Sequence, residues 1–156
     1  MATMLQIVDA IRNVLIAQTV LDLDEETCSI DLDTAVLNMI AKQGNRCCLL
    51  MFGGGARENR QPMQLSGGGG LSQRGLQWRW SWHGVYMIKY DTDPYQIEVD
   101  VLEAITAMSG MMVNNIRLGN IVPKADIIQI GQPDGADIND MTFYMIPFTI
   151  EVWTLD

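Results

Sequence analysis

The sequence predicts an α+β fold, in which a mostly antiparallel β-sheet carries two main helices packed on one face. Three observations lead to this expectation. An apolar stripe with helical spacing begins the chain, a long alternating segment rich in tryptophan occupies its middle, and another alternating segment ends it. A second helical stripe separates the two alternating segments. This order of elements favours a helical layer over a sheet of antiparallel strands.

The composition predicts a single domain that spans residues 1–156. Of the 156 residues, 48% are hydrophobic, which is enough for a substantial buried core. Eleven methionines and few charges indicate that subunit contacts cover part of the apolar surface. Asp9 and Arg12 interrupt the first apolar run, so we expect neither a signal peptide nor a membrane span. The three cysteines, two of them adjacent, favour reduced core thiols in a protein made in the cytoplasm.

The first third of the chain predicts two helices and a strand. Apolar residues at helical spacing predict a helix over Met4–Leu21. An acidic stretch, Asp22–Asp33, follows it. We expect Asp33 to cap a short helix that Gly44 ends. The apolar run Cys47–Phe52 lies between turn-forming residues, which predicts a short buried strand.

The segment Leu76–Asp91 has the clearest alternation in the chain and predicts a long strand. Successive strand side chains point to opposite faces of a sheet. Trp78, Trp80 and Trp82 are at alternate positions and therefore share one face. Arg79 lies between two of them in sequence and therefore faces the other side. A segment of this length would span about 50 Å as one strand. We therefore expect a bend or bulge at Gly84.

A second helix is predicted to follow this strand. Asp93 is placed as its N-cap, Pro94 suits its first position, and Gly110 ends it. Residues 111–121 and 125–132 then predict two strands, or one strand with a loop.

The chain is predicted to close with a turn and a strand. Gln132–Asp140 is rich in turn-forming residues, and Met141–Asp156 alternates as a long strand. Pro147 lacks an N–H group, so we expect it to place this strand at a sheet edge or to mark a bulge.

Residues 53–75 are predicted to form a Gly-rich basic arm within the domain. A phosphate-binding loop is excluded, because Gly70–Gly75 is followed by Leu76 and Gln77 where Lys and Ser or Thr are required. The glycines at 53–55 lead to no capped helix, so a dinucleotide fingerprint is excluded too. The short strand before the segment needs a sheet to join, which argues against an interdomain linker. The remaining expectation is a long loop or extended hairpin between two strands.

The arm lies in the one basic region of an acidic chain. Between Lys42 and Lys89 there are seven basic residues and one acidic residue, whereas the rest of the chain carries a net charge of −15. Flexible glycines and arginine donors predict an arm that becomes ordered on a partner, and an insertion without function is the alternative. We expect four arginines to contact a partner or another subunit: Arg57, Arg60, Arg74 and Arg79.

The sequence offers little for catalysis. The single histidine, His83, has no GxSxG motif or recognisable cysteine nucleophile to serve, so we expect a surface or interface role and no catalytic residue. An acidic series at Asp22, Asp24, Glu26 and Asp33 resembles a calcium loop, but it lacks the central glycine and the final glutamate. We therefore expect no metal and no cofactor.

The tryptophan stripe allows two interpretations. Exposed indoles stack on bases or sugars, and Arg79 on the opposite face argues against a combined stacking and phosphate platform. A core filled from one sheet face is the other interpretation, with part of the stripe covering a neighbouring subunit.

Three segments resemble the tail terminator and tail completion proteins of tailed bacteriophages, especially lambda-type tail terminators. They are IVDAIRNVLIA, WRWSWHGVYMIKYDTDPYQIEVDVLEAI and MTFYMIPFTIEVW, and they give the chain a similar order of elements. The resemblance implies a small α+β protein that is not an enzyme and forms a hexameric ring on the end of the tail tube. The Gly-rich arm and the acidic stretch Asp22–Asp33 depart from the family pattern.

The resemblance also implies a set of partners. They are other copies of the chain in the ring, the tail tube protein, and neck or connector proteins of the virion, with no membrane. The basic middle of one copy facing the acidic remainder of the next would give a contact able to close a ring. Remaining acidic residues would line a lumen through which DNA passes without specific binding. The alternative is a small binding module whose tryptophan-rich strand recognises a ligand or nucleic acid.

Overall fold

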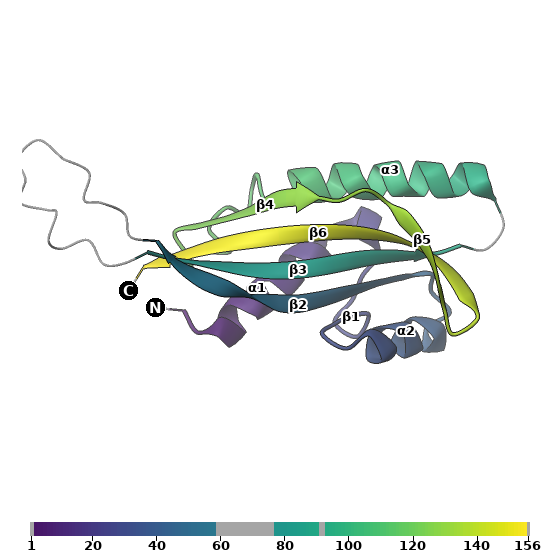
Figure 1. The fold of residues 1–156 in the computed structure, drawn as a ribbon, viewed down its shortest axis with the longest axis horizontal. Helices are drawn as coiled ribbons and strands as arrows, with labels where there is room; N and C mark the ends of the chain where they lie inside the picture. Colours follow the sequence, from purple (N-terminus) through teal and green to yellow (C-terminus); the bar gives the residue numbers. More distant parts are fainter. Residues whose placement is uncertain (1, 59–76, 91–92, 156) are drawn as a thin grey trace, which may run out of the picture.

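A computed structural model describes residues 2–58, 77–90 and 93–155 of the chain. The α+β class and the mostly antiparallel sheet are confirmed (Figure 1). The helices are α1 Met4–Ala17, the short 3₁₀ helix η1 Thr19–Leu21, α2 Leu32–Ala41 and α3 Pro94–Gly110. The strands are β1 Cys28–Ser29, β2 Arg46–Glu58, β3 Gln77–Lys89, β4 Lys124–Ile130, β5 Asp134–Ile138 and β6 Met141–Leu155.

The sheet is built around two long neighbouring strands, β3 and β6. The strand order is β1-β2-β3-β6-β4, and β5 pairs with β6 beside β4. β1 runs parallel to β2, and every other pair is antiparallel. Because β4 and β5 follow one another along the same side of β6, they act as one interrupted strand. The two long predicted strands, β3 and β6, thus lie in the interior of the sheet.

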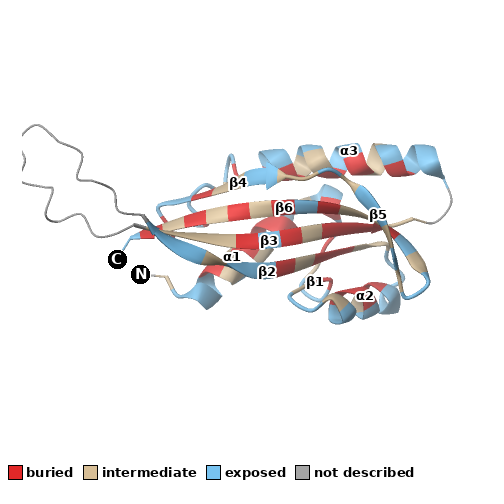
Figure 2. Ribbon diagram, viewed as in Figure 1, coloured by how far each residue is buried: buried red, intermediate tan, exposed pale blue. Residues whose placement is uncertain are grey.

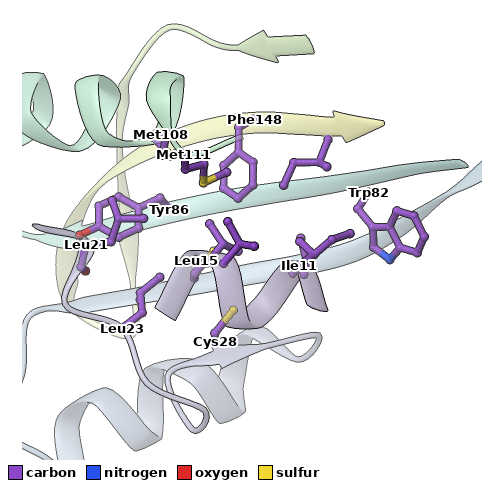
Figure 3. Close-up of a cluster of buried hydrophobic side chains, with 14 of the residues drawn as sticks. Ile11, Leu15, Leu21, Leu23, Cys28, Trp82, Tyr86, Met108, Met111 and Phe148 are labelled. Carbon is purple, nitrogen blue, oxygen red and sulfur yellow. Dashed lines mark hydrogen bonds between the residues drawn. The ribbon is translucent and has the colours of Figure 1, made fainter. Parts of the chain in front are cut away.

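Side chains from the two faces of the sheet enter different hydrophobic clusters. The larger cluster combines buried residues of α1 and α3 with every second residue of β3 and β6, such as Tyr86 and Phe148. Phe148 and Met108 approach each other between α3 and the sheet (Figure 3). A smaller cluster joins α2 to residues on the opposite face, including Met87 and Phe143. The burial bands along β3 and β6 follow this arrangement (Figure 2).

Helix boundaries follow local capping, with two departures from the predicted ends. A capping box between Thr3 and Gln6 begins α1, which ends at Ala17 before η1 continues to Leu21. α2 begins at Leu32, so Asp33 lies in its first turn and is not its cap. The predicted start of α3 is confirmed, because the Asp93 carboxylate accepts a hydrogen bond from the Tyr95 N–H.

The segment between α3 and β6 follows one expected alternative and departs from one prediction. Residues 111–121 form turns, with positive φ angles at Leu118, Gly119 and Asn120, and β4 follows them, so the alternative of one strand with a loop is confirmed and that of two strands is wrong. The predicted turn 132–140 contains β5. Its actual turn is Asn139–Asp140, where φ is 52° and 64°, as a tight two-residue hairpin of type I′ requires. The strand gains its pairing from β6, a partner that local composition does not reveal.

β3 has no bulge at Gly84, so that part of the expected bend or bulge is wrong. Gly84 pairs with Leu50 on one side and Phe148 on the other, in unbroken register. A Cβ atom there would lie 2.1 Å from Cζ of Phe148, so the glycine makes room for an aromatic ring. The bulge lies in β2, where the register shifts between Phe52 and Gly54.

Pro147 lies in an interior strand, so the expected sheet edge or bulge at this residue is wrong. β6 has β3 on one side and β4 with β5 on the other. The Pro147 carbonyl accepts a hydrogen bond of 2.7 Å from the Gly131 N–H, in the interval between β4 and β5. The backbone groups of a strand residue in an antiparallel sheet face the same side. The missing N–H of Pro147 therefore faces an interruption in the neighbouring strand, where no ladder bond is lost.

Candidate functional site: the aromatic and basic end of the β2–β3 hairpin

The outer end of the β2–β3 hairpin carries the two predicted contact arginines that the structure describes. Arg57 is exposed on β2, and Arg79 lies on β3 opposite Ala56. The guanidinium of Arg57 lies 5.8 Å from the centre of the Trp78 ring, a cation–π distance. Arg79 Nε is 3.8 Å from the Glu151 carboxylate on β6. Arg60 and Arg74 lie outside the described residues.

The side chains of the two arginines lie on different faces of the sheet. Arg57 shares the face of Trp78, whereas Arg79 alternates to the other face of β3. On that other face, Lys124 lies 4.6 Å from the ring centre of Trp153. The structure thus does not join Arg57 and Arg79 into one basic patch, and Arg57 is the one that accompanies the tryptophans.

The three tryptophans of β3 form a gradient from core to surface. Trp82 is 2% exposed and belongs to the main core, while Trp80 and Trp78 are half-buried. The rings of Trp78 and Trp80 stack with centroids 5.0 Å apart and planes 10° apart. Trp80 also donates a hydrogen bond from Nε1 to Thr154 Oγ1, over 2.9 Å. Of the two interpretations of the stripe, a core role therefore applies to Trp82, and the stacked pair lies at its margin.

Phe52 completes this aromatic row, and sequence reasoning did not select it. Its ring lies 5.4 Å from Trp82 and 6.1 Å from Trp80, measured between centroids, and 53% of the residue is exposed. The signal that could have found it is its position at the end of the apolar run beside the glycines. A large aromatic residue left half in solvent is typical of a contact surface.

Two of the three glycines after Phe52 make room for side chains, and the third has a backbone angle that favours glycine. A Cβ atom on Gly55 would lie 2.2 Å from the Trp80 ring, and one on Gly53 would lie 2.4 Å from the His83 ring. Gly54 has a φ of 104°, which side chains rarely adopt. Residues 53–58 therefore belong to β2, as in the extended-hairpin alternative, and the rest of the predicted arm, 59–75, lies outside the described residues.

An apolar groove of about 380 Å³ opens beside Phe52. It lies where the first turn of α1 and the segment after β1 approach β2. Leu5 and Ile30 are its most exposed residues, at 68% and 71%. The groove is lined by Met4, Leu5, Val8, Ile30, Leu50, Phe52 and Trp82. So much apolar surface in one place favours binding of a protein partner over solvent exposure.

The backbone of β2 beside this groove is a free edge within the described part of the chain. β1 pairs with β2 at Cys48 and Leu49 alone. The Cys48 N–H points to that side, because it donates to the Thr27 carbonyl over 2.9 Å. Alternation along a strand directs the N–H and C=O groups of Leu50 and Phe52 to the same side. The parallel pairing of Ser29 with Leu49 uses the Leu50 N–H, so the unpaired groups begin at the Leu50 carbonyl and continue at Phe52. An edge with unpaired groups next to an apolar groove suits the addition of another strand.

Histidine and cysteine chemistry is poorly supported among the described residues. His83 is exposed, and its Nδ1 lies 3.2 Å from Thr149 Oγ1. The prediction of reduced core thiols is confirmed, because all three cysteines are free and buried. Burial raises the pKa of Cys47 to about 12. The hydrogen bond that Cys48 donates to Cys28, together with burial, raises the pKa of Cys48 as well. The same hydrogen bond and the nearby Arg12 lower the pKa of Cys28. All three thiols are fully buried, so they lack the access that a nucleophile needs.

The acidic stretch is organised by internal hydrogen bonds. The Asp24 carboxylate accepts from the N–H groups of Glu26 and Thr27, each over 2.9 Å, and from Lys42 Nζ over 2.6 Å. Burial opposes ionisation, yet these bonds together lower the pKa of Asp24. The described residues contain no group of three or more His, Cys, Asp or Glu side chains arranged to hold a metal ion.

Comparisons with other proteins leave the site to be interpreted from its own geometry. No family model matches the chain, and no curated protein matches it in sequence. None of the helices in the described ranges has the length and apolarity that a membrane crossing requires. The function is therefore inferred from the groove, the aromatic row and the free strand edge.

Proposed function

We propose that this chain is a structural virion protein that forms a ring at the end of a phage tail tube, where it terminates the tail and joins it to the neck. The observation that carries the proposal is the apolar groove beside the free edge of β2. Met4, Leu5, Ile30 and Phe52 place exposed apolar surface next to unpaired backbone groups. A folded subunit of a homo-oligomer presents such a surface to its neighbour.

The fold and the charge distribution support the same assignment. The two long helices, α1 and α3, contribute to one hydrophobic cluster with β3 and β6, which supports the proposal of a small α+β subunit. The basic region Lys42–Lys89 and the acidic remainder give each copy two surfaces of opposite sign. The partners are further copies of the chain in a hexameric ring, the tail tube protein, and neck or connector proteins. DNA passes through the lumen without specific binding, and the protein is not an enzyme.

The ring is tested by measuring the mass of the purified protein by light scattering and imaging it by negative-stain electron microscopy. We expect closed rings, and we expect them to bind the ends of tail tubes. Monomers alone, with or without tail tubes present, would overturn the proposal.

The role of the arm is tested by removing residues 59–76 and joining Glu58 to Gln77 through an Asn-Gly turn. These two residues already pair across β2 and β3, so the sheet is kept. Rings that no longer attach to tubes or heads would assign the arm to docking, and loss of rings would assign it to subunit contact. A variant of full length with Arg60→Ser and Arg74→Ser separates the charge of the arm from its length.

The stacked Trp78–Trp80 pair with Arg57 above Trp78 favours one alternative, a small module that binds nucleic acid or another flat ligand. Titrating the protein with single-stranded oligonucleotides while recording tryptophan fluorescence distinguishes the two functions. Saturable quenching by a monomeric protein would support the module. Absence of quenching from a protein that forms rings would support the virion role.

A further inference from the structure

The outer edge of β4 is the second free edge of the sheet in the described part of the chain. Its beginning is covered, because the Ala125 N–H donates to the Ile116 carbonyl over 2.6 Å. From Ile127 to Ile130, the outer side of β4 pairs with no described strand. Ile128 lies at a bulge in this stretch and is 48% exposed. The edge is thus short, accessible and apolar at its centre.

The two free edges have compatible directions. β2 is antiparallel to β3, β3 is antiparallel to β6, and β6 is antiparallel to β4. β4 therefore runs opposite to β2. If a second copy lies beside the first in the same orientation, its β2 meets the first copy's β4 as an antiparallel neighbour, which continues the existing pattern of the sheet.

The two edges also lie at the same level along the strands. Across the sheet, Phe52 is in line with Trp82, Ile150 and Ile127 through successive pairings. Leu50 is in line with Ile130 in the same way. Copies joined through these stretches therefore need no displacement along the strand direction. A head-to-tail contact without such displacement meets one requirement of a closed ring, whose other requirement is a rotation between copies that closes, whereas a displaced contact produces an open helix.

Charge and apolar surface are complementary across the two edges. The β2 side carries Arg57 within the basic region of the chain. The β4–β5 side carries four acidic residues against one lysine, Lys124. The acidic residues are Asp126, Asp134, Asp137 and Asp140. The exposed Ile128 supplies an apolar side chain for the groove beside Phe52.

We propose that neighbouring copies in the ring join their sheets, with the edge Ile127–Ile130 of one copy pairing antiparallel to the edge Leu50–Phe52 of the next. Ile128 then occupies the groove that Leu5, Ile30 and Phe52 line. This inference rests on the proposed ring and identifies its contact. The occupant of the groove is a second copy of this chain, and the contact is head-to-tail, so each copy uses its two edges for two different neighbours.

The test uses one variant for each edge, Phe52→Glu and Ile128→Glu, with Tyr95→Glu as the matched control. Tyr95 is 73% exposed on α3 and belongs to neither edge. Light scattering should give the ring mass for the wild type and the control, and the mass of one chain for each edge variant. Circular dichroism spectra that match the wild type show that the variants fold.

Mixing the two edge variants makes the test specific. Each retains the edge that the other has lost, so an equimolar mixture should give a dimer of the two chains and stop there. A double variant, Phe52→Cys/Ile128→Cys, should give a ladder of disulfide-linked chains after mild oxidation. A variant with only one of these two substitutions should give at most linked pairs.

The outcomes separate this inference from the proposed function. A wild type that is a monomer overturns both. Rings that persist in both edge variants overturn the sheet contact and leave the ring standing. Edge variants that are both monomeric, fail to form the mixed dimer and give no cross-linked ladder also overturn the contact.

Discussion

At two strand positions, an aromatic ring packs where a Cβ atom would lie, so only glycine fits. Gly84 lies under the ring of Phe148, and Gly55 lies under the ring of Trp80. A strand glycine normally weakens a sheet, because it has no side chain to pack. Here a cross-strand aromatic ring packs on each glycine. Gly84 is buried in the core in this way, whereas Gly55 lies at the exposed end of the hairpin.

Gly84→Ala should destabilise the protein, because the new methyl group would overlap the buried Phe148 ring. We expect the free energy of unfolding to fall by about 1–3 kcal/mol, the usual cost of overpacking. Urea denaturation followed by fluorescence measures the change. Gly110→Ala is the matched control. It lies at the end of α3 with no atom within 4 Å of the added Cβ, so stability should stay the same or rise by up to about 1 kcal/mol. Equal stability of the Gly84→Ala variant and the wild type would show that the ring has room to move.

At the scale of elements, alternation and the Asp-Pro signal at the start of α3 were reliable, whereas the expected cap at Asp33 was not. Asp93 and Pro94 located the start of α3, and the alternating segments located β3 and β6. Each of these signals arises within a few residues of the chain. They need no knowledge of the partner strand or of the core that the element joins.

Asp93→Ala should shorten or loosen the start of α3. The carboxylate accepts a hydrogen bond from the Tyr95 N–H over 3.0 Å, and its loss leaves an end group of the helix unpaired. The expected loss of stability is about 1 kcal/mol, measured by thermal and urea unfolding. Asp93→Asn keeps the oxygen acceptor and should unfold close to the wild type. If both variants lose the same stability, the charge of Asp93 matters more than its cap.

Elements that depend on distant partners were the ones that sequence reasoning missed. β5 contains Asp134, Gly135 and Asp137, which are typical of turns, and it becomes a strand because β6 offers an edge beside it. The two-strand alternative made the reverse error at 111–121, where buried apolar residues such as Met111 and Leu118 pack against the core from turns. An apolar run alone does not distinguish these cases.

In the candidate site too, some features follow from the local sequence and others depend on distant contacts. The tryptophan face was visible in the sequence because it follows from alternation in a strand, and Arg57 was selected because it lies in the basic, Gly-rich segment. The groove could not be predicted from the sequence, because Leu5, Ile30 and Phe52 come from three separate segments that only the tertiary fold brings together. Predicting the bulge in β2 would have required knowing that His83 and Trp80 lie over the glycines.

At the scale of the whole molecule, the sheet order predicts where unfolding begins. β3 and β6 each have a paired strand on both sides, whereas β2 beyond Leu49 is paired on one side in the described part of the chain. We expect the slowest amide hydrogen exchange in β3 and β6, because their hydrogen bonds break only in global opening. Exchange at the Phe52 amide should be fast in an isolated subunit and slow after assembly. If the slowest exchange were found in α3 while β3 exchanged rapidly, this order would be contradicted.

The stacked Trp78 and Trp80 rings give the outer end of the sheet an optical property of its own. Two indoles with centroids 5.0 Å apart couple their electronic transitions, and the strength of the coupling falls steeply with their separation. Such a pair contributes an exciton couplet to the circular dichroism spectrum, with a sign set by the angle between the two transition dipoles. Any event that moves one indole against the other changes this couplet. The hairpin end therefore carries a spectroscopic label supplied by its own side chains, able to report the approach of a bound partner without added dye.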